Sequence, residues 1–438
     1  MTGTPGPRRR HLPGKGTTLT PSLQPLSGLR IVEGASFVAA PSAGMALAQL
    51  GAEVIRVDPP GGGSDFRRWP LSSGGDSLFW TGLNKGKRSV TIDHRSPQGR
   101  ELLLALATAP GPRSGIFLDN MVGRHRPTYD ELRALRRDVI HVHLQGRNNG
   151  SPAVDYTVNA EIGVARMTGP QDTERPVNHV LPAWDLLSGM IAANGVLAAV
   201  MHRDQTGQGA RLELALADVA LAGVGSMGWL AEAEMRGTPR ARHGNHMYGS
   251  FGVDFETADG HRVMVVALTE GQWSALRKVT GTAEVFAALE QALDADLTLE
   301  SDRYRLRETI AAVMRPWFAQ RDFGTVRRSL DVARVLWSPY LDMTQVASAA
   351  RADARSVAAE LDQPGIGPVL ATGSPLRWDG AGAAPVPAPR LGEHTEEVLS
   401  DILGLSAKEI GRLQEAGAVG VTADSAELIA NSSSQRSV

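Results

Sequence analysis

Between Leu29 and Leu144, short apolar runs alternate with amphipathic stretches, and this alternation limits the fold more than any other feature of the chain. The first unit runs from the apolar Leu29–Val32, through a helical pattern, to a second apolar run that ends at Asp58. Strand, helix and strand in this order form a βαβ unit with parallel strands. Further apolar runs ending at Asp119 and Leu144 repeat the pattern. The sequence therefore predicts an α/β fold with a parallel sheet.

The pattern changes after residue 235, where two apolar strands around the turn Ala258–Gly260 predict antiparallel hairpins followed by helices. A chain of 438 residues is long enough for two or three domains. The predicted organisation is a disordered extension (1–27), the first part of a large domain (28–235), a linker (236–247), a small α+β domain (248–350), a second linker (351–374), a return to the large domain (375–421) and a disordered tail (422–438). Within the large domain, Val219 to Met235 is predicted to be one long apolar helix.

Composition excludes several classes of function. The formal net charge is only −2, so the surface as a whole offers no basic field for nucleic acid or an anionic membrane. The chain has no cysteine, which excludes disulfides, thiolate metal sites and a thiol nucleophile and agrees with a cytoplasmic location. We find no apolar run typical of a secretion signal or long enough to span a bilayer. We therefore expect a cytoplasmic protein with no metal site and no membrane or nucleic-acid partner.

One carboxylate, Asp185, stands at the start of a helical pattern in the stretch from Thr168 to Arg203. The periodicity predicts a helix that begins just after Asp185, which makes this residue a candidate N-cap. The same geometry has a second interpretation. A helix N-terminus also keeps a carboxylate ionised, and an ionised, partly desolvated carboxylate is a usable nucleophile. Periodicity alone leaves both interpretations open.

Basic residues follow the second apolar run. Lys85, Lys87 and Arg88 either form a solvated face or, at the carboxyl edge of a parallel sheet, bind phosphates. Asp58 stands where a ribose-binding acid of a nicotinamide-dependent dehydrogenase would lie, but no G-x-G-x-x-G follows the first strand. A dehydrogenase therefore remains only as an alternative.

Four stretches, taken together and in order, resemble the class III CoA-transferases (the CaiB/BaiF family), which include formyl-CoA transferase and α-methylacyl-CoA racemase. They are LSGLRIVEGASFVAAPSAGMALAQLGAEVIRVD, LNKGKRSVTIDHRSPQGRELL, RHGNHMYGSFGVDFETADG and APRLGEHTEEVL. The resemblance covers about Leu26 to Val419. It implies a large doubly wound, Rossmann-like domain built from both chain ends, a smaller domain between them, and an interlocked homodimer.

The resemblance also implies chemistry. Asp185 matches the aspartate that attacks an acyl-CoA thioester in this family and then carries CoA as an aspartyl thioester. The implied partners are an acyl-CoA and a carboxylic acid, so coenzyme A is part of the substrate and no cofactor is bound permanently. Residues at positions that hold CoA in the family are Val38, Ala39, Ile92, Asp93, His94, Arg95, Asn120 and Arg124.

The stretches GGGSDFRRWP and VNHVLPAWD favour a branch of the family that moves CoA between the two carboxyls of one short unsaturated dicarboxylate such as mesaconate. Arg147, Arg166 and Asn178 are candidates to hold the free carboxylate. The alternatives are CoA transfer between two molecules, a 2-methylacyl-CoA racemase and a CoA-binding module without catalysis. The racemase alternative lacks its base, because Val154 stands where racemases have a histidine.

Overall fold

The computed structural model describes residues 24–111 and 113–420, and its main sheet has six parallel strands in the order β3-β2-β1-β4-β5-β6. The strands are β1 (Arg30–Gly34), β2 (Glu53–Asp58), β3 (Arg88–Thr91), β4 (Ile116–Asp119), β5 (Ile140–Gln145) and β6 (Ala210–Ala215). This is the strand order of a doubly wound, Rossmann-like sheet, and the direction of winding reverses between β1 and β4. The predicted α/β fold with a parallel sheet is confirmed.

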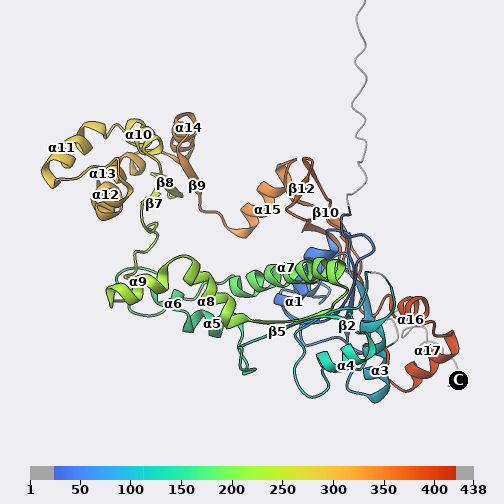
Figure 1. Cartoon of the computed structure of the whole chain (residues 1–438). Helices are drawn as coiled ribbons and strands as arrows, with labels where there is room; N and C mark the ends of the chain where they lie inside the picture. Colours follow the sequence, from blue (N-terminus) through green and yellow to red (C-terminus); the bar gives the residue numbers. More distant parts are fainter. Residues whose placement is uncertain (1–23, 112, 421–438) are drawn as a thin grey trace, which may run out of the picture.

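Helices cover both faces of this sheet (Figure 1). On one face, α1 (Ala39–Ala48) and α7 (Ala183–Thr206) bury an apolar core against β1, β4 and β5. On the other face, the core is closed by α3 (Pro97–Thr108), α4 (Tyr129–Leu135), α16 (Thr395–Leu403) and α17 (Ala407–Glu415). Strands buried on both faces are continuously apolar, which explains the unbroken runs seen in the sequence.

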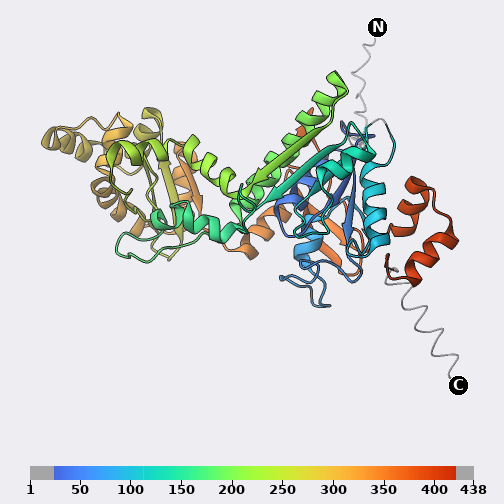
Figure 2. The same ribbon diagram turned by 60° about the horizontal axis from the view of Figure 1, so that its bottom comes forward.

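The last two helices return to the first sheet from the far end of the chain. Thr395 donates and accepts hydrogen bonds at Thr91 and Gly392, next to β3, and Val398 and Leu399 are fully buried beside α3. Figure 2 shows α16 and α17 flanking the sheet on the side opposite to helices α10–α14.

A second hydrophobic core surrounds a three-stranded antiparallel sheet in the order β7-β8-β9. Its strands are β7 (Phe251–Glu256), β8 (Arg262–Ala267) and β9 (Leu336–Pro339), and its helices are α10 (Glu270–Val279), α11 (Ala283–Leu293), α12 (Glu300–Arg305), α13 (Arg307–Ala319) and α14 (Phe323–Ala333). Figure 1 shows this group apart from the six-stranded sheet. The expected hairpin turns at Gly260, whose φ of 79° suits glycine.

The remaining elements lie outside these two sheets and their covering helices. They are α2 (Leu78–Leu83), α5 (Asp155–Glu161), α6 (Val164–Met167), α8 (Leu216–Ser226), α9 (Trp229–Arg236), α15 (Met343–Ala352), β10 (Ala358–Gln363), β11 (Gly367–Thr372), β12 (Arg377–Trp378) and β13 (Ala381–Gly382). The single long helix predicted from Val219 to Met235 is wrong. Gly228 has a left-handed φ of 74°, which ends one helix and begins the next.

Two other expectations differ from the structure. The expected extension 1–27 includes residues 24–27, which form a turn in which the Leu26 N–H donates to the Leu50 carbonyl at 3.0 Å. The expected linker 351–374 includes the antiparallel hairpin β10–β11. Residues 1–23 and the whole of the expected tail, 422–438, lie outside the described residues.

Helix α7 contradicts the expectation that no stretch could span a bilayer, because its 24 residues are long and apolar enough by length and composition. It nevertheless contributes Val196, Ala199 and Val200 to the core over the sheet. On α7, small residues such as Ala192 and Ala199 are buried, whereas large apolar residues such as Met190 and Met201 are exposed.

Candidate active site

Asp185 is the third residue of α7 rather than the residue before it. The helix begins at Ala183, and its N-cap, Pro182, has no side chain that accepts a hydrogen bond. The prediction that Asp185 is an N-cap is therefore wrong. Its carboxylate lies in the first turn of the helix, where the helix dipole favours negative charge.

A second carboxylate, Asp155 at the start of α5, caps α7 from a distance. Its Oδ2 accepts the backbone N–H groups of Trp184 at 2.8 Å and of Asp185 at 3.1 Å. Asn159, one turn further along α5, accepts the Trp184 indole N–H at 3.3 Å. The two side chains of α5 therefore fix both the backbone and the ring beside Asp185. Sequence reasoning missed this role, although Asp155 directly follows Val154, the position at which racemases have a histidine.

The pKa of Asp185 is raised to about 6, first by burial and then by the negative charge of Asp155, while Arg68 opposes the rise. Asp155 is itself buried, and among the described residues its Oδ1 has no hydrogen-bond partner. Asp185 is thus ionised at neutral pH but more basic than an ordinary aspartate. A basic, partly desolvated carboxylate is suited to nucleophilic attack.

Arg68, in the loop between β2 and α2, lies over two aromatic rings. Its guanidinium carbon is 5.5 Å from the centre of the Phe37 ring and 5.3 Å from that of Phe79. Phe37 has a left-handed φ of 63°, and its N–H donates to Asp65 at 2.9 Å. This strained conformation directly precedes Val38, the residue before α1. Arg68 was not singled out from the sequence, although the stretch GGGSDFRRWP contains it.

The start of α1 lies beside the start of α7 because the two helices meet at a glycine. A Cβ atom placed on Gly189 would lie 2.0 Å from Ser42 Oγ and 2.7 Å from the Ala39 carbonyl oxygen. Only glycine allows this approach. The contact, one helical turn after Asp185, places the predicted CoA residues Val38 and Ala39 near the carboxylate.

Asn120 joins the ends of β1 and β4. Its Oδ1 accepts the Ser36 N–H at 3.0 Å, and its Nδ2 donates to the Ser36 carbonyl at 2.8 Å. This is the point at which the winding of the sheet reverses, where ligands of open α/β sheets bind. The predicted residues Asn120, Val38 and Ala39 are therefore brought together at one crevice.

The other predicted CoA residues follow β3 and β4. Ile92 is fully buried, so its side chain is a core residue. Arg95 and Arg124 are exposed, and the Arg95 N–H donates to Asp93 at 3.1 Å. The pKa of His94 is lowered by burial, then by Arg95, and also by His125 beside Arg124. The loops after β3 and β4 thus approach each other and present cations at the carboxyl edge of the sheet. The residues of these two loops form a second group of predicted CoA residues, beside the group of Val38, Ala39 and Asn120.

The basic residues Lys85, Lys87 and Arg88, which lie before and at the first position of β3, are not phosphate ligands. Lys87 is buried and donates to both carboxylate oxygens of Glu33, at 2.8 and 2.9 Å, and its pKa is lowered by burial to about 8. The Lys85 ammonium donates to the Gly82 carbonyl at 2.7 Å. Arg88 pairs with Glu53 at 2.6 Å. All three stabilise the structure under the site, and the phosphate interpretation is wrong for them.

Among the described residues, one cluster has the donor set of a metal site. The ligand atoms of Asp119, His141 and His143 lie within 4.8 Å of one another. Each imidazole makes a hydrogen bond to a different oxygen of Asp119, at 2.6 Å for His141 and 2.9 Å for His143. Because both of its oxygens are hydrogen-bonded, the carboxylate of Asp119 can be buried. The two bonds also fix the end of β4, directly before Asn120.

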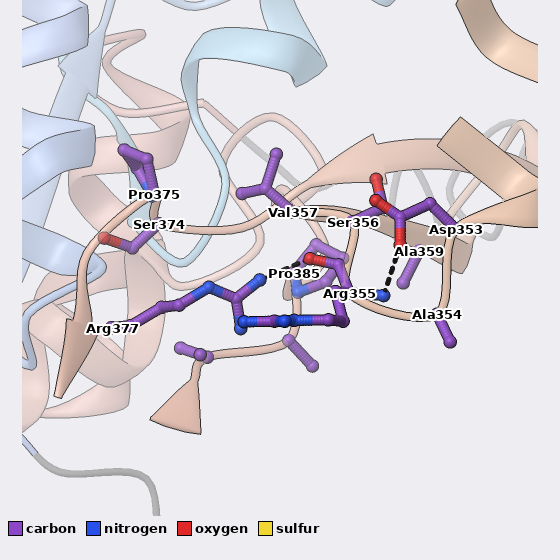
Figure 3. A pocket seen from close by; sticks show the side chains of 13 residues that line it. Asp353, Ala354, Arg355, Ser356, Val357, Ala359, Ser374, Pro375, Arg377 and Pro385 are labelled. Carbon is purple, nitrogen blue, oxygen red and sulfur yellow. Dashed lines mark hydrogen bonds between the residues drawn. The ribbon is translucent and has the colours of Figure 1, made fainter. Parts of the chain in front are cut away.

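A cavity of about 590 Å³ lies away from Asp185, between the loop 353–357 and the short strands near residues 374–385 (Figure 3). Arg377 lines it and donates to the Arg355 carbonyl. The cavity contains none of the predicted site residues, so it gives no support to a catalytic role there.

The residue before Asp155 disfavours the racemase alternative. Val154, which precedes Asp155, is exposed and offers no base.

Arg147, a candidate for the free carboxylate, is already paired with Glu161 and donates to the Pro152 carbonyl. Asn178 accepts a hydrogen bond from Asn159 at 3.1 Å.

Comparison with known proteins gives a consistent result. The sequence model of CoA-transferase family III matches residues 26–395. The chain is 51% identical to 2-methylfumaryl-CoA isomerase of Chloroflexus aurantiacus, over 90% of this chain and 97% of that protein. It is 29% identical to succinyl-CoA:mesaconate CoA-transferase of Haloarcula marismortui, over 86% of this chain and 96% of that protein.

Solved structures agree on the fold. A CAIB/BAIF family protein from Brucella suis matches with a TM-score of 0.70 and 23% identity, over 86% of this chain and 99% of that chain. The hypothetical protein Rv3272 from Mycobacterium tuberculosis matches with a TM-score of 0.67 and 24% identity, over 86% of this chain and 99% of that chain. At this identity the likeness concerns the fold alone.

Proposed function

Because this enzyme belongs to CoA-transferase family III, we propose that it moves CoA between the two carboxyls of 2-methylfumaryl-CoA (mesaconyl-CoA) through an aspartyl-CoA thioester on Asp185. The observation that carries the proposal is the carboxylate in the first turn of α7, which Asp155 positions and whose pKa is about 6. The relative with 51% identity, named for this substrate, supports the choice of acyl group.

The covalent steps need no external base. Asp185 attacks the thioester carbonyl, CoA leaves as a thiolate, and a mixed anhydride forms. The thiolate attacks the aspartyl carbonyl of the anhydride, which releases the dicarboxylate and leaves CoA on Asp185. The other carboxylate of the substrate then attacks the aspartyl thioester, which expels CoA as a thiolate and forms a second mixed anhydride. The thiolate attacks this anhydride at its substrate carbonyl and releases the Asp185 carboxylate. Asp185 is regenerated, and CoA is attached at the other end of the acid.

The developing oxyanions require hydrogen-bond donors other than the first free N–H groups of α7. The N–H groups of Trp184 and Asp185 already donate to Asp155. We expect the donors to come from backbone that faces the start of α7.

For CoA, we propose the crevice between β1 and β4 together with the cations after β3 and β4. Val38, Ala39 and Asn120 line the first part, and Arg95 and Arg124 are the phosphate ligands of the second. The exposure of both arginines supports this role.

Transfer within one molecule has a physical advantage. A dicarboxylate that stays bound presents its second carboxylate at a high effective concentration, so no free acceptor has to enter. The test is mesaconyl-C1-CoA incubated with isotopically labelled free mesaconate. We expect unlabelled mesaconyl-C4-CoA.

Transfer between two molecules is the second candidate, because two relatives at 28 and 29% identity are named as transferases between different acids. In that case, label enters the C4 thioester as fast as the thioester forms. Absence of any product from mesaconyl-C1-CoA would refute the proposed substrate.

The nucleophile is tested directly by trapping. Hydroxylamine added with the acyl-CoA should convert Asp185 to a hydroxamate, identified by peptide mass. Asp185→Ala should abolish transfer and trapping while CoA still binds. Full activity in this variant would end the proposed mechanism.

We also propose that the enzyme is a homodimer. Large apolar side chains are exposed along α7, α8 and α9, namely Leu187, Met190, Ile191, Met201, Leu221, Leu230 and Met235. Such a surface is usually covered by another chain. Light scattering after gel filtration should give twice the chain mass of 46.6 kDa. A monomer across the concentration range would contradict the proposal.

A further inference from the structure

Arg68 is an exposed cation that the surrounding aromatic rings hold in place. Its guanidinium lies over Phe37 and Phe79, at 5.5 and 5.3 Å from the ring centres. Among the described residues, no carboxylate forms a salt bridge with it and its side chain makes no hydrogen bond. Stacking uses the faces of the guanidinium and leaves its N–H groups free at the edge.

This cation belongs to the site of Asp185. Its guanidinium stacks on Phe37, and the helix that follows Phe37, α1, meets α7 at Gly189, one turn after Asp185. Arg68 also opposes the rise in the pKa of Asp185. The ring of Phe37, on which Arg68 stacks, directly precedes Val38 at the start of α1. Arg68 and Asp185 are therefore separate charges at one site.

The candidates suggested by the sequence serve less well. Arg147 is engaged by Glu161 and by the Pro152 carbonyl. Arg166 is exposed on α6, and in the described part of the chain no ring or carboxylate fixes its guanidinium. Arg68 alone among these arginines is both held in place and electrostatically coupled to Asp185.

We propose that Arg68 binds the free carboxylate of a dicarboxylate monothioester whose thioester carbonyl faces Asp185. This inference rests on the proposed function and assigns the substrate class to a residue. A planar guanidinium accepts a carboxylate with two parallel hydrogen bonds. After CoA has moved to Asp185, the acid turns end for end, and the same arginine then binds the carboxylate that was first esterified. A monocarboxylic acyl group leaves Arg68 unpaired and gains nothing from it.

The test compares two thioesters that differ only by the free carboxylate, mesaconyl-C1-CoA and methacrylyl-CoA. For each, kcat/KM of acyl hydroxamate formation is measured in the presence of hydroxylamine. The variants are Arg68→Met and Arg68→Lys, with Arg67→Met as the matched control. Arg67 is the adjacent exposed arginine, and no ring stacks on it in the described residues. Thermal unfolding and the affinity for free CoA show whether each variant keeps its fold and its coenzyme site.

We expect Arg68→Met to lower kcat/KM for mesaconyl-C1-CoA by about 10–100-fold, the range for a lost hydrogen bond between charged groups. Methacrylyl-CoA should change far less, because it has no free carboxylate and Arg68 affects its reaction only through the pKa of Asp185. Arg68→Lys should lie between the two because lysine keeps the charge but not the bidentate geometry. Arg67→Met should behave as the wild type with both thioesters.

Two results would overturn the inference. One is an equal fall with both thioesters, which would assign Arg68 to CoA binding or to structure. The other is an unchanged kcat/KM for mesaconyl-C1-CoA in Arg68→Met. Both require a wild-type enzyme that converts mesaconyl-C1-CoA. If the wild type does not convert it, the proposed function fails instead, so the two failures are distinguishable.

Discussion

The carboxylate of Asp155 accepts the backbone N–H of Asp185 at 3.1 Å, so one acid fixes the position of another across 30 residues of chain. The same contact caps α7 and places a negative charge beside the proposed nucleophile. The position of Asp185 therefore depends on this neighbour, and its basicity depends first on burial and then on the charge of the same neighbour. When Asp185 becomes acylated it loses its charge, and the repulsion from Asp155 is relieved as the reaction proceeds.

Asp155→Asn separates the two roles of this neighbour. The amide oxygen still accepts the two N–H groups, but the charge is lost, so the pKa of Asp185 should fall. We expect the acid limb of the kcat/KM profile to move down by on the order of one pH unit, because nearby like charges interact by about 1–4 kcal/mol. The maximal rate should also fall, since a less basic carboxylate is a weaker nucleophile.

The matched control for this variant is Asp218→Asn, which changes an exposed aspartate in the first turn of the neighbouring helix α8. The groups that face Asp185 are Asp155 from α5 and Arg68 from the loop before α2, and α1 carries no titratable side chain. His179 lies beside the Trp184 ring. A profile of Asp155→Asn that superimposes on that of the wild type would show that Asp155 acts only as a cap.

The wild-type enzyme should lose activity as the pH falls through about 6. Burial and Asp155 raise the pKa of Asp185 to about 6, and only the ionised carboxylate attacks the thioester. The rate of hydroxamate formation, measured between pH 4.5 and 8, checks this prediction. An acid limb below pH 5, with the fold intact, would show that Asp185 has an ordinary pKa.

Asp185→Asn should stabilise the free enzyme at pH 8 while it abolishes transfer. The folded pKa of about 6 exceeds the ordinary aspartate value of 3.8, so keeping Asp185 ionised lowers the free energy of unfolding above pH 6. Removing the charge should raise this free energy by about 1–3 kcal/mol at pH 8. As the pH falls from 6 to 4, the wild type gains the proton and the difference should vanish. Urea unfolding at pH 4, 6 and 8 measures this difference in the free energy of unfolding. A variant that is less stable than the wild type at pH 8 would contradict the prediction.

The parallel sheet could be predicted from the sequence because its strands are buried on both faces and leave continuous apolar runs. The start of α7 could not, because its cap is supplied by Asp155, which is distant in sequence. Lys87 was misread for a similar reason, since its partner Glu33 lies 54 residues earlier. Periodicity describes local structure, whereas these side chains are defined by contacts between distant segments.

The candidate site divides in the same way. Asp185 was identified by its match to a family position, and Asn120 by the same match at the end of a predicted strand. Arg68 and Phe37 carried no local signal, because their stacking depends on the left-handed backbone of Phe37 in the loop between β1 and α1 and on a loop after β2. Only the folded chain places them beside the carboxylate.

Gly189→Ala should disrupt the site from the back of α7. The added Cβ would lie 2.7 Å from the Ala39 carbonyl oxygen, a backbone atom that cannot move without shifting α1. We expect a loss of about 1–3 kcal/mol in the free energy of unfolding, as for overpacking in a core. Because Val38 and Ala39 begin α1, the affinity for CoA should fall as well.

Gly195→Ala, six residues later in the same helix, is the matched control. There the added Cβ would meet only the end of the Leu212 side chain, at 3.1 Å, which can rotate away. Alanine also favours the helix by up to about 1 kcal/mol, so this variant should be as stable as the wild type or more stable. Urea unfolding and CoA titration of both variants give the answer. Equal behaviour of the two would mean that α1 and α7 adjust freely, and that their close approach does not set the position of Asp185.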